Sequence, residues 1–260
     1  MDTIEGPVMV VAGPGTGKTQ VLALRIAHIL QETDVGADGM GGHAAGEVAS
    51  RIAVEVLQTL SPTLISPEID EDSVEDLLMH SLHSIDSEIS VVTDEEIEKR
   101  GMGTTLTALL IRDKYVSLLH VGDSRCYRLR GNTLEQLSND HTVVQELLDQ
   151  GAISQSEAAE HPQRSMLTQA LRGDGDVTPV LQMYEVKKGD RYLLCSDGLS
   201  GVLTEKEIKV GLKKSDKDEA VKFLIDATYV NGAPDNVTVL IADISDSPTT
   251  STSLLGAAHD

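Results

Sequence analysis

Aromatic and basic residues are scarce in this 260-residue sequence. It contains no tryptophan and one phenylalanine, and aromatic residues make up 2% of the chain. Proteins that hold single-stranded nucleic acids stack the bases on aromatic side chains, of which this chain has few. The 21 lysines and arginines face 42 aspartates and glutamates, so the formal net charge is −21. Such a surface repels phosphate backbones, and we expect no nucleic acid as a partner.

The features of secreted and membrane proteins are also missing. The two cysteines, Cys126 and Cys195, lie in separate strand-like stretches, which is typical of small buried side chains rather than of a disulfide or metal motif. No apolar run reaches the roughly 20 residues that span a bilayer. The N-terminus does not show the basic-then-apolar pattern of a signal peptide. We therefore expect a cytoplasmic protein that does not enter membranes.

The acidic excess has two interpretations, a solvated surface or carboxylates that hold divalent cations. Between Arg51 and Lys99 there is no lysine or arginine, whereas 13 aspartates and glutamates occur. More than half of the net charge therefore comes from one stretch that is mainly helical in pattern. The simplest interpretation of that stretch is a solvated helix face.

The chain divides into three stretches of different character. Residues 1–35 indicate a strand, a glycine-rich loop and a helix, and are not expected to form an independent domain. Residues 36–244 form a longer mixed unit with enough apolar residues for a core. Residues 245–260 are rich in serine and threonine, and we expect a disordered tail there.

Within the long unit, the hydrophobic period changes from helical to alternating and back. Apolar residues at helical spacing predict long helices, the second with Asp72 as its N-cap. Tight polar turns between short apolar runs predict two hairpins. This order of elements predicts an α+β fold, an antiparallel β-sandwich flanked by helices. The expected helices are 45–60, 72–90, 142–150, 154–160, 165–171 and 217–229, and the expected strands lie within 104–121, 126–137, 180–186, 191–195 and 237–244.

Four aspartates share one local setting. Asp38, Asp123, Asp197 and Asp235 each lie at the start or end of an apolar strand, beside glycine, serine or proline. Carboxylates that meet at the rim of a sheet repel one another unless cations lie between them. Such hard oxygen ligands suit Mg²⁺ or Mn²⁺. Two ions held close together can clamp a phosphoryl group and lower the pKa of a shared water.

Five motifs that include these aspartates resemble the bacterial PPM-type protein phosphatases, the metal-dependent serine/threonine phosphatases of type 2C. They follow the order found in that family and extend over residues 36–243, about four-fifths of the chain. The resemblance implies the family's sandwich fold and hydrolysis of phosphoserine and phosphothreonine in proteins that serine/threonine kinases have modified. The motifs are Ala37–His43, Gly101–Thr105, Val121–Arg125, Cys195–Leu199 and Pro234–Thr238.

The resemblance also implies a role for each site residue. Asp38 would bridge two Mn²⁺ or Mg²⁺ ions, and the carbonyl of Gly39 would bind one of them. Asp197 and Asp235 would complete the shell of the first ion, and Asp123 would share a third, weaker ion with Asp197. A metal-bound hydroxide would attack phosphorus with no phosphoenzyme intermediate, and residues 142–164 resemble the family's flap.

The histidines and arginines leave some alternatives open. His43 either protonates the leaving alkoxide as a general acid or only forms a hydrogen bond at a helix start. We expect a packed structural role for His120, whereas His141 and His161 fit either kind of role. Arg125 and, in the flap, Arg164 are expected to pair with carboxylates rather than with substrate phosphate.

The first 35 residues depart from the family pattern. The family begins with strands that carry a phosphate-gripping arginine, followed by an acidic motif that orients metal-bound waters, and residues 1–35 match neither. We therefore expect phosphatase activity to be reduced or lost. The alternative to an enzyme is a catalytically silent phosphatase fold that binds metal or a phosphoprotein.

In place of the family's first strands and acidic motif, the sequence has a phosphate-binding loop. It follows an apolar strand, precedes a helical stretch and resembles the start of a UvrD-like helicase, which implies nucleotide binding. A nucleotide-binding helicase fragment is therefore a third hypothesis, although the second acidic motif of such enzymes has only a short candidate, at 91–95. A hybrid chain explains both resemblances, with the strand at 7–12 filling a vacant place in the sandwich and with reduced stability. The loop residues are Gly13, Gly15, Gly17, Lys18 and Thr19.

Overall fold

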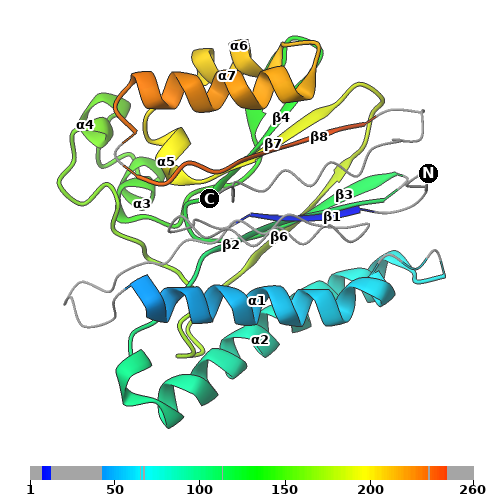
Figure 1. Cartoon of the computed structure of the whole chain (residues 1–260), viewed down its shortest axis with the longest axis vertical. Coiled ribbons are helices and arrows are strands. Elements are labelled where there is room, and N and C mark those ends of the chain that lie inside the picture. The colour runs from blue at the N-terminus through cyan, green and yellow to red at the C-terminus, as the bar shows by residue number, and fades with distance from the viewer. Residues whose placement is uncertain are drawn as a thin grey trace, which may run out of the picture.

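Two antiparallel sheets face each other and carry helices on their outer sides (Figure 1). The structure is a computed structural model that describes residues 8–12, 43–64, 66, 68–112, 114–233 and 235–244. Its helix–sheet–sheet–helix layers confirm the predicted α+β sandwich. No helix within these ranges is long and apolar enough to cross a membrane.

Each sheet has four strands, and every neighbouring pair is antiparallel. The predicted hairpins at 104–121 and 126–137 are confirmed as β2–β3 and β4–β5. The first sheet has the order β1 (Val8–Ala12), β2 (Leu106–Ile111), β3 (Tyr115–Val121), β6 (Val180–Glu185). The second has the order β5 (Thr133–Gln136), β4 (Arg125–Arg130), β7 (Arg191–Cys195), β8 (Val239–Asp243).

Helices form the two outer layers. The pair α1 and α2 lies against the first sheet, and α6 and α7 lie against the second (Figure 1). The short helix α5 directly follows β7, and α3 and α4 lie between β5 and β6 in the sequence. The bounds are α1 His43–Leu64, α2 Glu71–Glu95, the 3₁₀ turn Ile97–Lys99, α3 Val143–Asp149, α4 Gln155–Ala159, α5 Asp197–Ser200, α6 Glu205–Leu212 and α7 Lys217–Val230.

Three apolar clusters correspond to the three interfaces between the layers. Alternate residues of one strand point to opposite faces, so Leu110 packs under α1 and α2 whereas Leu109 packs between the sheets. On the second sheet, Leu194 faces the same inter-sheet cluster and Leu193 faces α6 and α7. Burial on both faces explains why these strands are apolar throughout.

Residues 8–12 take the edge position of the first sheet. Val8 pairs with Ile111 and Ala12 pairs with Thr107, so the strand occupies a place in the sandwich as the hybrid-chain hypothesis requires. The glycine loop, the helix expected after it, Asp38, Gly39 and the tail at 245–260 lie outside the described residues.

Two local predictions are wrong. The N-cap of α2 is Asp70, whose Oδ1 accepts a hydrogen bond from the Ser73 N–H at 2.8 Å, and not Asp72, which lies in the first turn. Residues 165–171 contain no helix, because their backbone pairs instead with distant segments. Thr142 bridges to Leu167, and Thr104 bridges to Leu171.

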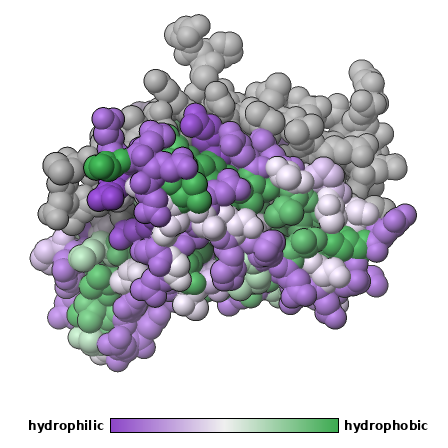
Figure 2. All heavy atoms as spheres, turned by 90° about the horizontal axis from the view of Figure 1, so that it is seen from below, coloured by the Kyte–Doolittle hydropathy of each residue, from purple (hydrophilic) through white to green (hydrophobic). Residues whose placement is uncertain are grey.

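The acidic stretch is largely a solvated face, as expected. The side chains of residues 55–98 that carry charge are mostly exposed, and hydrophilic atoms cover much of this side of the molecule (Figure 2). Asp86 is the exception, because it is 7% exposed. Its carboxylate accepts three backbone N–H bonds, from Arg172 at 3.1 Å, Gly173 at 2.7 Å and Gly175 at 2.9 Å. Asp86 therefore anchors a loop and is not part of the solvated face.

Candidate active site

Asp123 lies in a turn between β3 and β4 that requires glycine at the preceding position. Gly122 has φ +112°, a conformation that side chains disfavour. A Cβ on Gly122 would lie 2.3 Å from Cγ2 of Thr105. The glycine therefore lets this turn pack directly on Thr105, the residue before β2, and Asp123 is 8% exposed there.

Asp197 is the first residue of α5, at the end of β7. One carboxylate oxygen, Oδ1, is buried and has no hydrogen-bond partner among the described residues. The next residue, Gly198, packs so closely on Asn236 that a Cβ would lie 2.2 Å from its carbonyl oxygen. The turn that carries Asp197 therefore lies against the segment that carries Asp235.

The hydroxyl of Ser196 joins these two segments. It donates to the carbonyl of Asn236 at 3.1 Å and accepts from the Thr238 N–H at 3.0 Å. Asp235 itself is exposed, and its Oδ1 accepts a hydrogen bond from the Asn236 N–H at 2.7 Å. Asp235 thus lies at the start of the segment that leads into β8.

Strand register brings Asp123 to the same rim. Arg125 is the Cα partner of Cys195 in the β4–β7 pair, so Asp123 and Asp197 both lie just beyond the same end of that pair. Three of the five predicted metal ligands, Asp123, Asp197 and Asp235, therefore lie along one rim of the second sheet. Of the other predicted residues, Asp38 and Gly39 lie outside the described residues, and His43 is described only as the first residue of α1.

The donor set fits a hard divalent cation. A buried carboxylate oxygen without a hydrogen bond costs free energy unless a cation or proton neutralises it, and Oδ1 of Asp197 is such an atom. No cluster of three or more histidine, cysteine or acidic side chains is close enough to hold an ion within the part of the chain that the structure describes. Asp38, the predicted bridging ligand, is outside that part.

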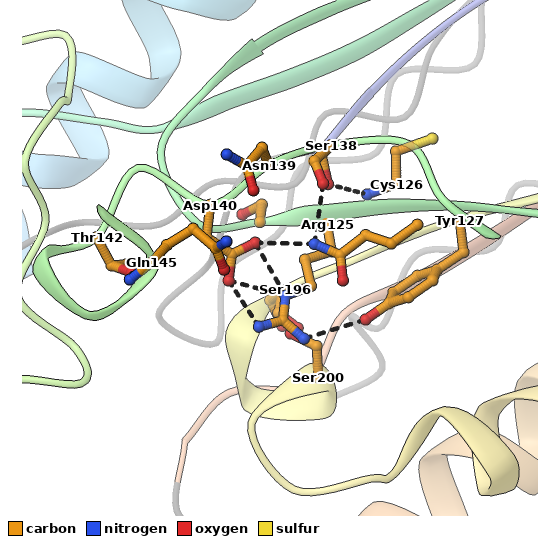
Figure 3. A network of polar contacts seen from close by, with 12 residues as sticks. Arg125, Cys126, Tyr127, Ser138, Asn139, Asp140, Thr142, Gln145, Ser196 and Ser200 are labelled. Atoms are coloured by element: carbon orange, nitrogen blue, oxygen red, sulfur yellow. Dashed lines mark hydrogen bonds and ion pairs between the residues drawn. The ribbon is translucent and has the colours of Figure 1, made fainter. Parts of the chain in front are cut away.

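An ion pair between Arg125 and Asp140 lies behind the rim and supports the turns of Asp123 and Asp197. The guanidinium of Arg125 donates to Asp140 through Nε, at 2.9 Å to Oδ1, and through Nη2, at 2.6 Å to Oδ2. Its Nη1 donates to the Tyr127 hydroxyl at 3.1 Å, and Figure 3 shows this group beside Ser196 and Ser200. Burial lowers the pKa of Arg125, but attraction to Asp140 outweighs burial and raises it. The prediction that Arg125 pairs with a carboxylate is confirmed.

The rings of His120 and His141 lie side by side next to the Asp123 turn, tilted to each other and with centroids 4.9 Å apart. His120 is fully buried, and its Nε2 lies 3.0 Å from the Asn139 carbonyl and its Nδ1 2.9 Å from the Thr107 hydroxyl. The structural role expected for His120 is confirmed. His141 Nδ1 accepts a hydrogen bond from the Gly122 N–H at 3.0 Å, so this ring supports the Asp123 turn.

The flap residues behave differently. His161 Nδ1 accepts from the Gln163 N–H at 3.2 Å, a contact within the flap itself. Arg164 Nη1 donates to the Ala159 carbonyl at 3.4 Å. Arg164 is thus seen with a backbone carbonyl rather than with the expected carboxylate.

The free energy of unfolding should fall in acid, because the rings of His120 and His141 are buried in their neutral form. Burial, reinforced by the His141 ring, lowers the pKa of His120 to about 3, and burial also lowers the pKa of His141. The unfolded chain takes up these protons near pH 6.5, so it binds more protons than the folded chain below that pH. For His120 alone, the free energy of unfolding should drop by about 2 kcal/mol between about pH 7.5 and pH 5.

Urea unfolding at a series of pH values measures this loss. His120→Gln retains hydrogen-bonding groups but does not titrate, and its stability should depend less steeply on pH than that of the unaltered chain. Equal slopes for both proteins would show that His120 does not carry the effect.

Sequence reasoning did not single out Asp140 or Thr107. Both take their roles from partners on a neighbouring strand, since Asp140, after β5, meets Arg125 of β4, and Thr107 of β2 meets His120 of β3. The Asp140–His141 pair in the loop after β5 was the available signal. A polar pair in a loop is common, so the signal is weak.

Comparison with known proteins places this site in a family. A family model described as protein phosphatase 2C matches residues 27–232. The serine/threonine protein phosphatase PstP of Mycobacterium tuberculosis is 44% identical over 213 residues, which are 81% of this chain and 40% of that protein. The serine/threonine phosphatase Stp of Listeria welshimeri is 37% identical over 211 residues, 80% of this chain and 82% of that protein. The chain thus spans about two fifths of the length of the mycobacterial protein.

Solved structures agree with the sequence relatives. A crystal structure of Mycobacterium tuberculosis PstP superimposes with a TM-score of 0.75 at 38% identity, covering 93% of this chain and 100% of that one. The catalytic domain of PstP in complex with two manganese ions has a TM-score of 0.73 at 36% identity, covering 93% and 99%. This chain therefore belongs to the protein phosphatase 2C family.

Proposed function

We propose that this chain hydrolyses phosphoserine and phosphothreonine in proteins with the help of bound Mn²⁺ or Mg²⁺. The observation that carries the proposal is the rim along which Asp123, Asp197 and Asp235 lie, with one buried oxygen of Asp197 lacking a hydrogen bond among the described residues. Family membership and the two manganese ions of a relative support the same chemistry.

The proposed metal ligands keep the roles that the motifs imply. Asp38, the carbonyl of Gly39, Asp197 and Asp235 would hold two ions, and Asp123 would share a third, weaker one with Asp197. When bound, such ions polarise a phosphoryl oxygen and lower the pKa of a bound water. The carboxylates set where the phosphoryl group rests, because the turns after β3, β7 and α7 fix their backbone positions.

His43 supplies the proton in this proposal. His43 is the first residue of α1 and the last residue of the motif Ala37–His43, which also contains Asp38. Donation of its proton to the departing serine or threonine oxygen would avoid release of a free alkoxide. The alternative of a helix-start hydrogen bond predicts that replacing His43 leaves the rate unchanged.

The substrates are proposed to be cytoplasmic proteins that serine/threonine kinases have phosphorylated, and the net charge of −21 disfavours nucleic acid. Residues 36–244 form the phosphatase domain in this proposal, and residues 1–35 contribute β1 to its first sheet. The predicted nucleotide-binding role of Gly13, Gly15, Gly17, Lys18 and Thr19 has a separate test, since Lys18→Ala should abolish any ATP binding by the chain.

Phosphate release from a phosphothreonine peptide tests the function. We expect release at about millimolar Mn²⁺, a loss of at least about 100-fold on chelation, and recovery when Mn²⁺ is restored in excess. A phosphotyrosine peptide of the same sequence is the matched control and should be a poorer substrate. Release that persists without divalent cations, or no release at any Mn²⁺ concentration, would contradict the proposal.

A further inference from the structure

A cavity of about 360 Å³ lies between α2 and the loop that leads into β6. The helix α2 belongs to the outer layer on the first sheet (Figure 1), whereas the metal-site rim belongs to the second sheet. The cavity is therefore separate from the candidate active site, and no step of the proposed hydrolysis uses it. Its volume is within the usual range of pockets that bind ligands.

The two walls of this cavity are fastened to each other. Asp86 of α2 accepts three backbone N–H bonds from the loop. Gly173 of the loop packs so closely on α2 that a Cβ would lie 2.4 Å from the backbone nitrogen of Ser90. Gly173 and Gly175 have φ of +78° and +74°, conformations that glycine adopts at little cost. The cavity is therefore preformed, and a ligand need not order the loop in order to bind.

The charged groups that line the cavity are carboxylates. Oδ1 of Asp86 accepts two of the three loop bonds and Oδ2 accepts one. Because a carboxylate has about four acceptor positions, Oδ2 keeps one for a ligand. Asp174 supplies a second, exposed carboxylate. His83 Nδ1 lies 2.9 Å from the Met79 carbonyl, so in the neutral ring Nδ1 donates and Nε2 remains an acceptor.

This lining suits neither an anion nor a metal ion. The loop N–H groups that could bind an anion are already bound to Asp86, and none of the described lining residues is a lysine or arginine. The side chain of Arg172 packs against Gly103 instead, where a Cβ would lie 2.8 Å from its Cγ. Within the described ranges, no three histidine, cysteine or acidic side chains are placed to share a metal ion. The lining therefore favours an organic cation.

Apolar side chains form the rest of the lining. Leu82, Val177 and Pro179 lie on the cavity together with the carboxylates. A guanidinium group on an aliphatic stem matches both parts, because the group has five N–H donors and no acceptor while the stem packs on apolar surface. The surrounding helix also attracts cations, since 13 acidic and no basic residues lie between Arg51 and Lys99.

We propose that this cavity binds the guanidinium group of an arginine side chain that a protein partner presents. Asp86 and Asp174 bind the guanidinium, and Leu82, Val177 and Pro179 contact the aliphatic stem. Free arginine has the same guanidinium but also a carboxylate, which the two aspartates repel, whereas an arginine within a chain has neutral peptide bonds in its place. The inference goes beyond the proposed phosphatase function and does not depend on it.

Butylguanidinium and its neutral counterpart butylurea are matched probes of the site. In NMR spectra of the ¹⁵N-labelled full chain at about 0.15 M salt, butylguanidinium should shift the amide signals of Gly173, Asp174 and Gly175. The shifts should saturate with a Kd of about 1 mM, which is ordinary for so small a ligand. Butylurea should bind at least about 10-fold more weakly, because it lacks the charge. Arginine capped at both ends should bind at least about threefold more tightly than free arginine.

Three variants at exposed positions locate the site without disturbing the core. Ser87→Lys places an ammonium group in the cavity near Asp86 and should abolish binding. His80→Lys adds the same charge to α2 about two turns away, outside the cavity lining, and should leave the Kd unchanged within about twofold. Asp174→Asn keeps an oxygen for the Asp176 N–H but removes a charge, and should raise the Kd about fivefold.

Several results would overturn the inference. Equal affinity for butylurea would mean that the cavity selects only an apolar stem. Shifts that spread over the acidic face without saturation would mean a general attraction of cations to the surface. Binding by Ser87→Lys as tight as that by His80→Lys would place the ligand elsewhere. If free arginine bound as tightly as capped arginine, the assignment to a protein partner would be wrong. Hydrolysis of the phosphopeptide enters none of these outcomes, so the proposed function is tested separately.

Discussion

Replacing Asp197 by asparagine is expected to lower kcat/KM for a phosphothreonine peptide by about 10³-fold, which corresponds to about 4 kcal/mol of lost metal-dependent stabilisation. Asparagine keeps the shape of the side chain but removes the negative charge that a divalent ion requires. The free energy of unfolding without metal should not fall, because Oδ1 of Asp197 has no hydrogen bond to lose among the described residues. Loss of activity without loss of stability would identify a ligand.

Thermal unfolding with and without Mn²⁺ makes the distinction. An ion that binds only the folded state raises the melting temperature, and this rise should shrink in Asp197→Asn. Asp226→Asn is the matched control, because Asp226 is an exposed aspartate of α7 whose partner is Lys222. If the two variants lose activity equally, or if Asp197→Asn keeps the full response to Mn²⁺, Asp197 is not a metal ligand.

Local patterns were sufficient to predict the two hairpins and to place Asp123 and Asp197 at the ends of strands. The β2–β3 and β4–β5 hairpins are encoded by short apolar runs around tight turns, and their pairing involves neighbours in the sequence. Asp123 and Asp197 were found because glycine or serine beside them marks the ends of strands. That Asp197 packs on the segment of Asp235 could be inferred only from the family resemblance, since 38 residues separate them.

Two of the remaining features depend on contacts between distant segments. Residues 165–171 have helical spacing, but they contain no helix, and Leu167 and Leu171 bridge to Thr142 and Thr104. Asp86 looked like one more solvated acid on α2, yet three backbone N–H groups of the loop after the flap bind it. Propensity cannot predict these two features, because the deciding partners are elsewhere in the fold.

The N-cap of α2 is a local choice instead. Asp70 and Asp72 are both good helix caps, and the hydrogen bond from the nearby Ser73 N–H selects Asp70.

The contact at Gly198 should make the rim intolerant of even one methyl group. In Gly198→Ala the new Cβ would lie 2.2 Å from the carbonyl oxygen of Asn236 and 2.9 Å from its carbon. Both atoms belong to the backbone, so the segment of Asp235 must move away from Asp197 by about 1 Å, a displacement that typically costs about 100-fold in rate. We expect that loss in kcat/KM, together with about 2 kcal/mol of destabilisation from overpacking.

Gly211→Ala is the matched control for this change. Gly211 is also a helical glycine, in α6, and its Cβ would lie 2.6 Å from Cδ2 of Leu224, a buried side chain of α7 rather than backbone at the rim. The higher helix propensity of alanine offsets up to about 1 kcal/mol of the cost of crowding, and activity should be unchanged. If Gly198→Ala were as active as Gly211→Ala, the spacing of Asp197 and Asp235 would not limit the reaction. Measuring the free energy of unfolding together with kcat/KM separates the loss of stability from the loss of rate. Gly211→Ala is crowded in the same way as Gly198→Ala, but it lies away from the rim.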